Sequence, residues 1–341
     1  MPLRWQTRAW RWLQLRRGAL WNGLKIALAL LLTGVVLTQT SVDALLGLAQ
    51  RVAPGWVVLG GLCYGAILLL SARRYWLLIE RGVPFATFFN LFILQNAITN
   101  FVASSAGAVS YVAMLRGEHQ VRVSRSVGSV LLAKAGDGAM VALALLLTGA
   151  LVWAQIGPLH GLVVGLLATS ALGGLLVLGL WLYGATRGMP GWLQRRLDRP
   201  ATQRIMTLPR VRALLVAAAD LGSQALGPLT LPTLVSSALI LLLTFAWAYC
   251  NMRAFGLQIE LGPLLFVTAL TQILSIVPVQ VFGGLGVYDA SLVYLYGLFG
   301  IGGPEFISAV IGIRLLFCAL NLLCLAYVPV NTQLRRQSSP S

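Results

Sequence analysis

Apolar segments of membrane-spanning length recur along the whole chain, separated by short polar turns. Full crossings are predicted at about 19–40, 55–72, 126–154, 159–184, 233–255 and 305–330. A helix needs roughly 20 apolar residues to cross the hydrocarbon core, where it satisfies its own backbone hydrogen bonds. The pattern therefore predicts an all-α polytopic membrane protein with about six full spans.

Two more apolar stretches, 85–118 and 262–300, do not suit simple spanning helices because small residues interrupt them. The first contains the small-residue run 104–107, and the second contains the glycine-rich run 283–286. Broken backbone at membrane depth is tolerated only where protein buries it or where it lines a wet cavity. Both stretches are therefore predicted to form re-entrant or broken hairpins.

The two interrupted stretches belong to a candidate internal repeat. Sliding the chain along itself lays residues 104–107 on 283–286 and, one position further, 126–134 on 306–314. Corresponding broken segments in two halves indicate a transporter-type binding site between them. We predict repeat halves of about 55–155 and 233–330, with Gly107 and Gly286 meeting at a shared cavity. The alternative is chance matching among the common Gly, Ala and Ser residues.

Basic residues mark the predicted cytoplasmic side. The polar loop 185–212 is rich in arginine, and both flanks of the first hairpin are basic. Cytoplasmic loops carry the excess of Lys and Arg, so both termini are expected in the cytoplasm. The expected location is the inner (plasma) membrane. The first hairpin then enters from the cytoplasm and the second from the other face, so the repeat is expected to be inverted.

The membrane domain is predicted to be single and continuous, over residues 19–332. Residues 1–18 interleave Arg with Trp and Leu, which is typical of a basic amphipathic segment that lies on an anionic leaflet. Residues 333–341 form a polar C-terminal tail.

Composition excludes several classes of function. The chain is 58% hydrophobic and 10% charged, with a mean hydropathy of +0.83, which excludes a soluble domain. Its net charge of +16 comes from short loops, which favours anionic lipid headgroups over nucleic acid as the partner. Two histidines and four cysteines lack metal-ligand spacing, and no nucleotide-binding or hydrolase motif is present. We expect no metal, no cofactor and no enzymatic activity.

Charged residues inside predicted spans are the first candidates for a site, since each costs at least ~2.5–3.5 kcal/mol to insert. Lys134 and Arg314 stand at equivalent repeat positions, where they would hold an anionic headgroup such as a phosphate. The alternatives are that Lys134 pairs with Asp137, and that Arg314 pairs with Asp289 or caps a carbonyl. The candidate substrate-binding residues are Arg314, Lys134, Asp289, Gly283, Gly284, Gly286, Asp137, Gly107, Asn100 and Arg73.

These features resemble the lysylphosphatidylglycerol synthase transmembrane (flippase-like) family, over about residues 20–330. The resemblance rests on Arg73 and Arg74 at the end of a span, the break at 104–107, the Lys134 and Asp137 pair of positions, Pro278 with the run 283–289, and Arg314. It implies a stand-alone membrane domain without the aminoacyl-transferase domain. The implied role is lipid translocation, or a function beside envelope, glycolipid, hopanoid or archaeal lipid-linked glycan synthesis.

The chain departs from the family pattern in its first half. The family would have a proline before the glycine and an acidic residue after it, and residues 103–108 supply neither. Lys134 also stands where the family usually has arginine. Transfer of lysine to lipid is therefore not predicted.

Taken together, these patterns predict a protein that translocates, or helps to translocate, an amphipathic anionic or glycosylated lipid between leaflets. The alternative is a membrane-embedded transferase or accessory subunit in lipid-linked glycan, glycolipid or hopanoid synthesis; a small-solute transporter is the third reading. Expected partners are membrane lipids and envelope-biosynthesis enzymes. Since the chain has no ATP-binding motif, a gradient or mass action would drive movement.

Overall fold

A computed structural model describes residues 52–79, 82–101, 104–157, 230–274 and 287–338, with a few positions between 160 and 168. Several predicted features lie outside the described residues. They are the segment 1–18, the spans 19–40 and most of 159–184, the loop 185–212, and the run 278–286 that includes Gly283, Gly284 and Gly286.

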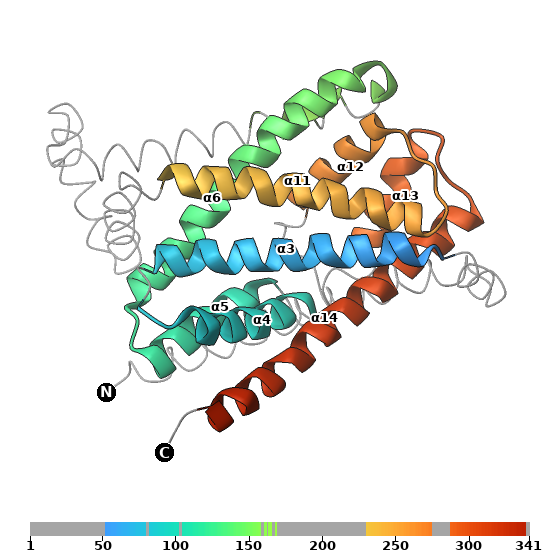
Figure 1. Cartoon of the computed structure of the whole chain (residues 1–341). Coiled ribbons are helices and arrows are strands. Elements are labelled where there is room, and N and C mark those ends of the chain that lie inside the picture. Colours follow the sequence, from blue (N-terminus) through green and yellow to red (C-terminus); the bar gives the residue numbers. More distant parts are fainter. Residues whose placement is uncertain are drawn as a thin grey trace, which may run out of the picture.

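Every regular element in the described part of the chain is a helix, which confirms the predicted all-α class (Figure 1). The elements are α3 (Pro54–Leu78), α4 (Phe85–Phe101), α5 (Ser104–His119), α6 (Val123–Leu151), a short 3-10 turn η1 (Trp153–Gln155), α11 (Thr230–Ala254), α12 (Leu261–Leu274), α13 (Val287–Gly297) and α14 (Pro304–Ser338).

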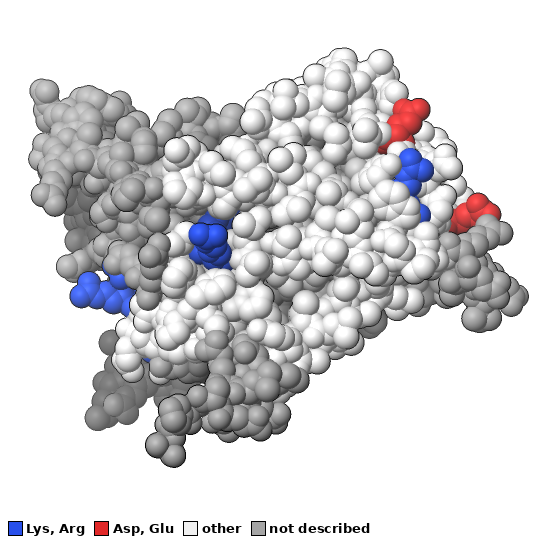
Figure 2. Space-filling model, in the orientation of Figure 1, with Lys and Arg blue, Asp and Glu red and all other residues white. Residues whose placement is uncertain are grey.

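The described region contains four helices that are long and apolar enough to cross a membrane. They are Pro54–Leu78, Arg125–Leu151, Leu231–Ala254 and Pro304–Pro329. Their outward side chains include leucines such as Leu62, Leu147 and Leu323, each more than half exposed, which suits contact with lipid tails. On the face drawn in Figure 2 the charged side chains of the described residues lie toward the two ends, with an uncharged belt between them.

Short helices occupy the two stretches that were predicted to be broken. At 1.5 Å per residue, the 17 residues of α4 and the 16 of α5 are shorter than the ~30 Å core of a bilayer. The 14 residues of α12 and the 11 of α13 are shorter still. A helical hairpin therefore stands where the first was predicted, and the break of the second, residues 275–286, lies outside the described residues.

Helices from the two halves of the chain pack against each other. Helices α3 and α11 run side by side and antiparallel, and the Ala53 amide at the start of α3 donates to the Ala254 carbonyl at 2.9 Å (Figure 1). Helix α4 packs on α14, while α12 packs on α6. Each half thus has helices in the order long, short, short, long. The first short helix of each half, α4 or α12, packs on the last long helix of the other half, α14 or α6.

Gly107 is the point where α4 and α5 approach each other most closely. A Cβ atom at this position would overlap Oγ1 of Thr99 and lie 3.1 Å from Cα of the same residue. Thr99 is held in place, since its hydroxyl donates to the Gln95 carbonyl at 3.0 Å and accepts from the Gln95 amide at 3.1 Å. The glycine in this run therefore serves helix packing.

Replacing Gly107 with alanine should open the α4–α5 hairpin, because the new methyl group has no space. We expect a loss of about 1–3 kcal/mol in the free energy of unfolding. Thermal unfolding of the purified protein in detergent measures it.

The matched control is Gly117→Ala on the same helix, where an added Cβ meets nothing within 4 Å. This change should leave the stability equal or raise it by up to about 1 kcal/mol. Equal unfolding temperatures for the two variants would show that the helices do not depend on this contact.

Candidate functional site

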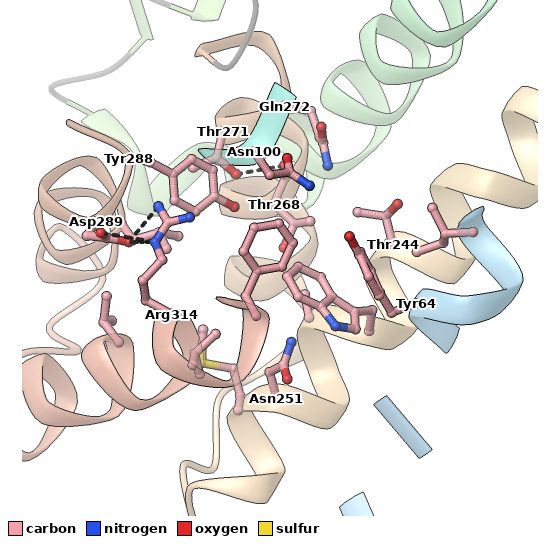
Figure 3. Close-up of a pocket in the computed structure, with 18 of the residues that line it drawn as sticks. Tyr64, Asn100, Thr244, Asn251, Thr268, Thr271, Gln272, Tyr288, Asp289 and Arg314 are labelled. Atoms are coloured by element: carbon pink, nitrogen blue, oxygen red, sulfur yellow. Dashed lines mark hydrogen bonds and ion pairs between the residues drawn. The ribbon is translucent and has the colours of Figure 1, made fainter. Parts of the chain in front are cut away.

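A cavity of about 310 Å³ lies where helices of both halves converge. The first half lines it from α3, α4 and α6, and the second half from α11, α12, α13 and α14. Both hairpins reach it, since Thr99 and Asn100 come from the first and Tyr288 and Asp289 from the second. Hydroxyl and amide side chains stand among aromatic and aliphatic ones on its wall (Figure 3).

Arg314 and Asp289 form an ion pair on one wall of this cavity (Figure 3). The Arg314 Nε donates to the two carboxylate oxygens at 3.1 and 3.3 Å, and Nη2 lies 3.0 Å from Oδ1. Asp289 stands in the first turn of α13, where the helix dipole favours a negative charge. The guanidinium also lies 5.1 Å from the ring centre of Tyr288 and 5.8 Å from that of Phe317. The sequence left open whether Arg314 binds a headgroup, pairs with Asp289 or caps a carbonyl, and in the structure it pairs with Asp289.

Lys134 lines the same cavity from α6 and is exposed to it. Its ammonium group makes no ion pair or hydrogen bond with the part of the chain that the structure describes. The alternative pairing of Lys134 with Asp137 is therefore wrong. Asp137 is occupied by Arg74, whose planar guanidinium fits a carboxylate better than a lysine does.

Arg74 ties three helices together. Its two terminal nitrogens donate to the two carboxylate oxygens of Asp137, and Nη1 also donates to the hydroxyl of Ser237 at 2.6 Å. Arg74 is only 5% exposed, and its partners stand on α6 and α11. Asp137, a candidate binding residue in the sequence, thus has a structural role within the first half, and the bond from Arg74 to Ser237 joins the two halves.

Arg73, the neighbouring candidate, points away from the cavity. It is exposed and lines a separate crevice between α3 and α11. Consecutive residues on a helix do not share a face, so two adjacent arginines take up different roles.

A network of amides joins the cavity wall to α14. The side-chain oxygen of Asn321 accepts hydrogen bonds from Tyr64 at 2.9 Å, Asn96 at 3.1 Å and Asn100 at 2.8 Å. Asn321 itself is 2% exposed. Sequence reasoning missed this residue, although an amide within an apolar span is a signal for a contact between helices.

The structure divides the candidate residues into three groups. Lys134, Asp289, Arg314 and Asn100 line the cavity. Asp137, Gly107 and Arg73 do not line it, because they serve an ion pair, a helix contact and a separate crevice. Gly283, Gly284 and Gly286 lie outside the described residues. Among the residues that are described, no cluster of three His, Cys, Asp or Glu side chains could hold a metal ion.

Replacing Arg74 with leucine should destabilise the protein strongly, because it leaves the Asp137 carboxylate and the Ser237 hydroxyl without their donor. Removing one partner of a buried ion pair costs about 3–5 kcal/mol, and the partial exposure of Asp137 places the expected loss at the lower end. Chemical or thermal unfolding in detergent measures this loss.

Arg73→Leu is the control, since the same substitution one position earlier removes an exposed side chain. Its effect should stay within about 0.5 kcal/mol. If both variants lose the same stability, the tie between α3, α6 and α11 does not hold the bundle.

Comparison with known proteins places the chain in a family. A family model described as "Lysylphosphatidylglycerol synthase TM region" matches residues 22–323, which includes every described residue that lines the cavity. No curated protein matches the chain. The resemblance seen in the sequence is confirmed by a match over most of its length. The chain is therefore a multi-pass membrane protein that belongs to the lysylphosphatidylglycerol synthase TM region family.

Proposed function

We propose that the protein translocates, or helps to translocate, an amphipathic lipid with an anionic or glycosylated headgroup between the two leaflets. The observation that carries the proposal is a cavity with polar side chains on its wall, reached by both hairpins, in which Lys134 has no protein counter-ion within the described chain. An uncompensated cation inside an apolar bundle is costly and persists where it serves a ligand or an ion.

A phosphate would supply the missing negative charge. Charge-assisted hydrogen bonds to a headgroup contribute about 1.5–3 kcal/mol each, which offsets part of the cost of holding an ammonium group within an apolar span. Arg314 stands on another wall of the same cavity and offers a second contact. The headgroup would thus cross beside the charged and polar side chains of the cavity while the acyl chains stay in the hydrocarbon.

The arrangement of the halves supports alternating access. Both halves have helices in the same order, and Lys134 and Arg314 occupy equivalent positions on α6 and α14. We infer that the halves are inverted repeats, with the basic loops of the first hairpin in the cytoplasm. Inverted repeats of broken helices around a central site are the architecture of many secondary transporters. The expected setting is the inner membrane with both termini in the cytoplasm, and envelope-biosynthesis enzymes would supply or use the lipid.

The state of Asp289 favours transport over group transfer. Both of its oxygens lie within hydrogen-bonding distance of Arg314, so this carboxylate is poorly placed to act as a base toward a substrate. It is the only acidic side chain among the described residues that line the cavity.

Lipid movement can be measured in proteoliposomes that contain a fluorescent anionic lipid, with an impermeant reductant that bleaches the outer leaflet. The unmodified protein should expose the inner-leaflet lipid to bleaching. Lys134→Met should slow this at least about tenfold, since it removes the unpaired charge. Leu239→Ala, an exposed position on α11, is the control and should not change the rate. No bleaching beyond that of empty liposomes for the unmodified protein would contradict the proposal.

The role of Arg314 is separated from that of its partner by a double variant. Arg314→Leu alone should stop lipid movement whether Arg314 contacts a phosphate or only neutralises Asp289. In the double variant Arg314→Leu, Asp289→Asn, movement should remain lost if Arg314 contacts the lipid. Recovered movement would show that the pair is structural and that the assignment of Arg314 to binding is wrong.

A further inference from the structure

Two hydrogen-bond donors of residues on the cavity wall have no acceptor in the described part of the chain. They are the indole Nε1 of Trp247 and the amide Nδ2 of Asn251, both buried, and neither finds a partner in the described chain. The residues stand one turn apart on α11, and both line the cavity. Asn251 is 3% exposed, and leaving a buried donor without an acceptor is costly. The pair therefore suits a ligand that brings oxygen atoms to this wall.

Aromatic rings surround these donors. The ring of Trp247 lies 6.1 Å from that of Tyr64 and 5.8 Å from that of Phe317, so helices α3, α11 and α14 together present an aromatic wall. The C–H face of a sugar or cyclic polyol is apolar with slight positive charge, and it packs well against the negative face of such rings. Amide and hydroxyl groups beside an aromatic wall are suited to a ligand with many hydroxyl groups.

The charge of the described cavity wall favours a phosphate with one negative charge. Lys134, Arg314 and Asp289 are the charged residues on the described wall, and their net charge is one positive. A phosphodiester carries one negative charge, whereas a phosphomonoester carries about 1.5–2 at neutral pH and would leave charge uncompensated. The volume of about 310 Å³ is at the lower end of small-molecule sites, which suits a headgroup with one ring.

We propose that the cavity selects a lipid whose headgroup is a monoanionic phosphodiester carrying one sugar or cyclic polyol ring. The phosphate is bound at Lys134 and Arg314, and Trp247 and Asn251 bind oxygens of the ring. This inference rests on the proposed lipid-binding function of the same cavity and adds the chemistry of the headgroup and two specificity residues.

Competition binding to the purified full-length protein tests the proposal with four short-chain lipids. They are phosphatidylinositol, phosphatidylglycerol, phosphatidic acid and a monoglucosyl diacylglycerol. Phosphatidylinositol, which has one charge and a six-membered ring, should bind most tightly. Phosphatidylglycerol lacks the ring, phosphatidic acid has excess charge, and the glucosyl lipid lacks the phosphate, so each should bind at least about threefold more weakly. Equal affinity for phosphatidylinositol and phosphatidylglycerol would overturn the proposal.

Two variants locate the preference on α11. Trp247→Phe keeps an aromatic ring but loses the N–H, and Asn251→Leu keeps the branched shape of the side chain but loses the amide. Each should lower the affinity ratio of phosphatidylinositol to phosphatidylglycerol about three- to tenfold, the value of one hydrogen bond. Trp153→Phe, a tryptophan outside the cavity, is the control and should keep the ratio of the unmodified protein. An unchanged ratio in both cavity variants would overturn the assignment.

The failure of this inference differs from the failure of the proposed function. Lipid movement in proteoliposomes without any headgroup preference in binding would overturn the inference and keep the transport proposal. A clear preference with no lipid movement would keep the inference and overturn transport.

Discussion

The need to compensate every charge inside an apolar bundle determines how this protein is held together. Arg74 satisfies Asp137 and Ser237 across three helices, and Arg314 satisfies Asp289 across two. Each of these ion pairs joins two charged side chains that water would not stabilise at membrane depth. Lys134 is the cation on the cavity wall that the described protein leaves without a partner, and the functional proposal follows from that one unpaired charge.

The ties also explain why a cavity exists between the halves. Arg74 on α3 reaches Ser237 on α11, and Asn321 on α14 reaches Asn100 on α4, so polar contacts connect the first half to the second at more than one place. Hydrogen bonds between helices are individually modest, at about 1 kcal/mol, and they can be exchanged one at a time. An interface between the halves that is made of such contacts can stabilise one conformation and still allow a second one. A transporter of lipids needs two such conformations.

The sequence predicts the helices well because length and hydropathy are local properties. The sequence predicts poorly which side chains bond each other across helices, because this depends on the face of the helix on which each residue lies. Lys134 and Asp137 stand three positions apart and suggested a pair, yet the carboxylate is taken by Arg74, which is 63 positions away in sequence. Gly107 was a candidate for ligand contact because small residues interrupt its segment, but this glycine lies within α5, where it allows the close approach of α4. No sequence pattern pointed to Trp247 and Asn251. Their proposed role depends on the structure, in which their side-chain N–H groups find no acceptor among the described residues.

Access to the cavity from both sides of the membrane is the most direct test of the central claim that a lipid headgroup crosses through it. The four native cysteines are replaced, and single cysteines are introduced at Ile67, which lines the cavity, and at Leu69, which is exposed on the outer surface of the same helix. A charged, impermeant thiol reagent is applied to oriented vesicles from one side or the other. If a headgroup crosses through the cavity, the cysteine at 67 should react from both sides, while that at 69, in the lipid, should react from neither. Reaction at 67 from one side alone, or from neither, would contradict it.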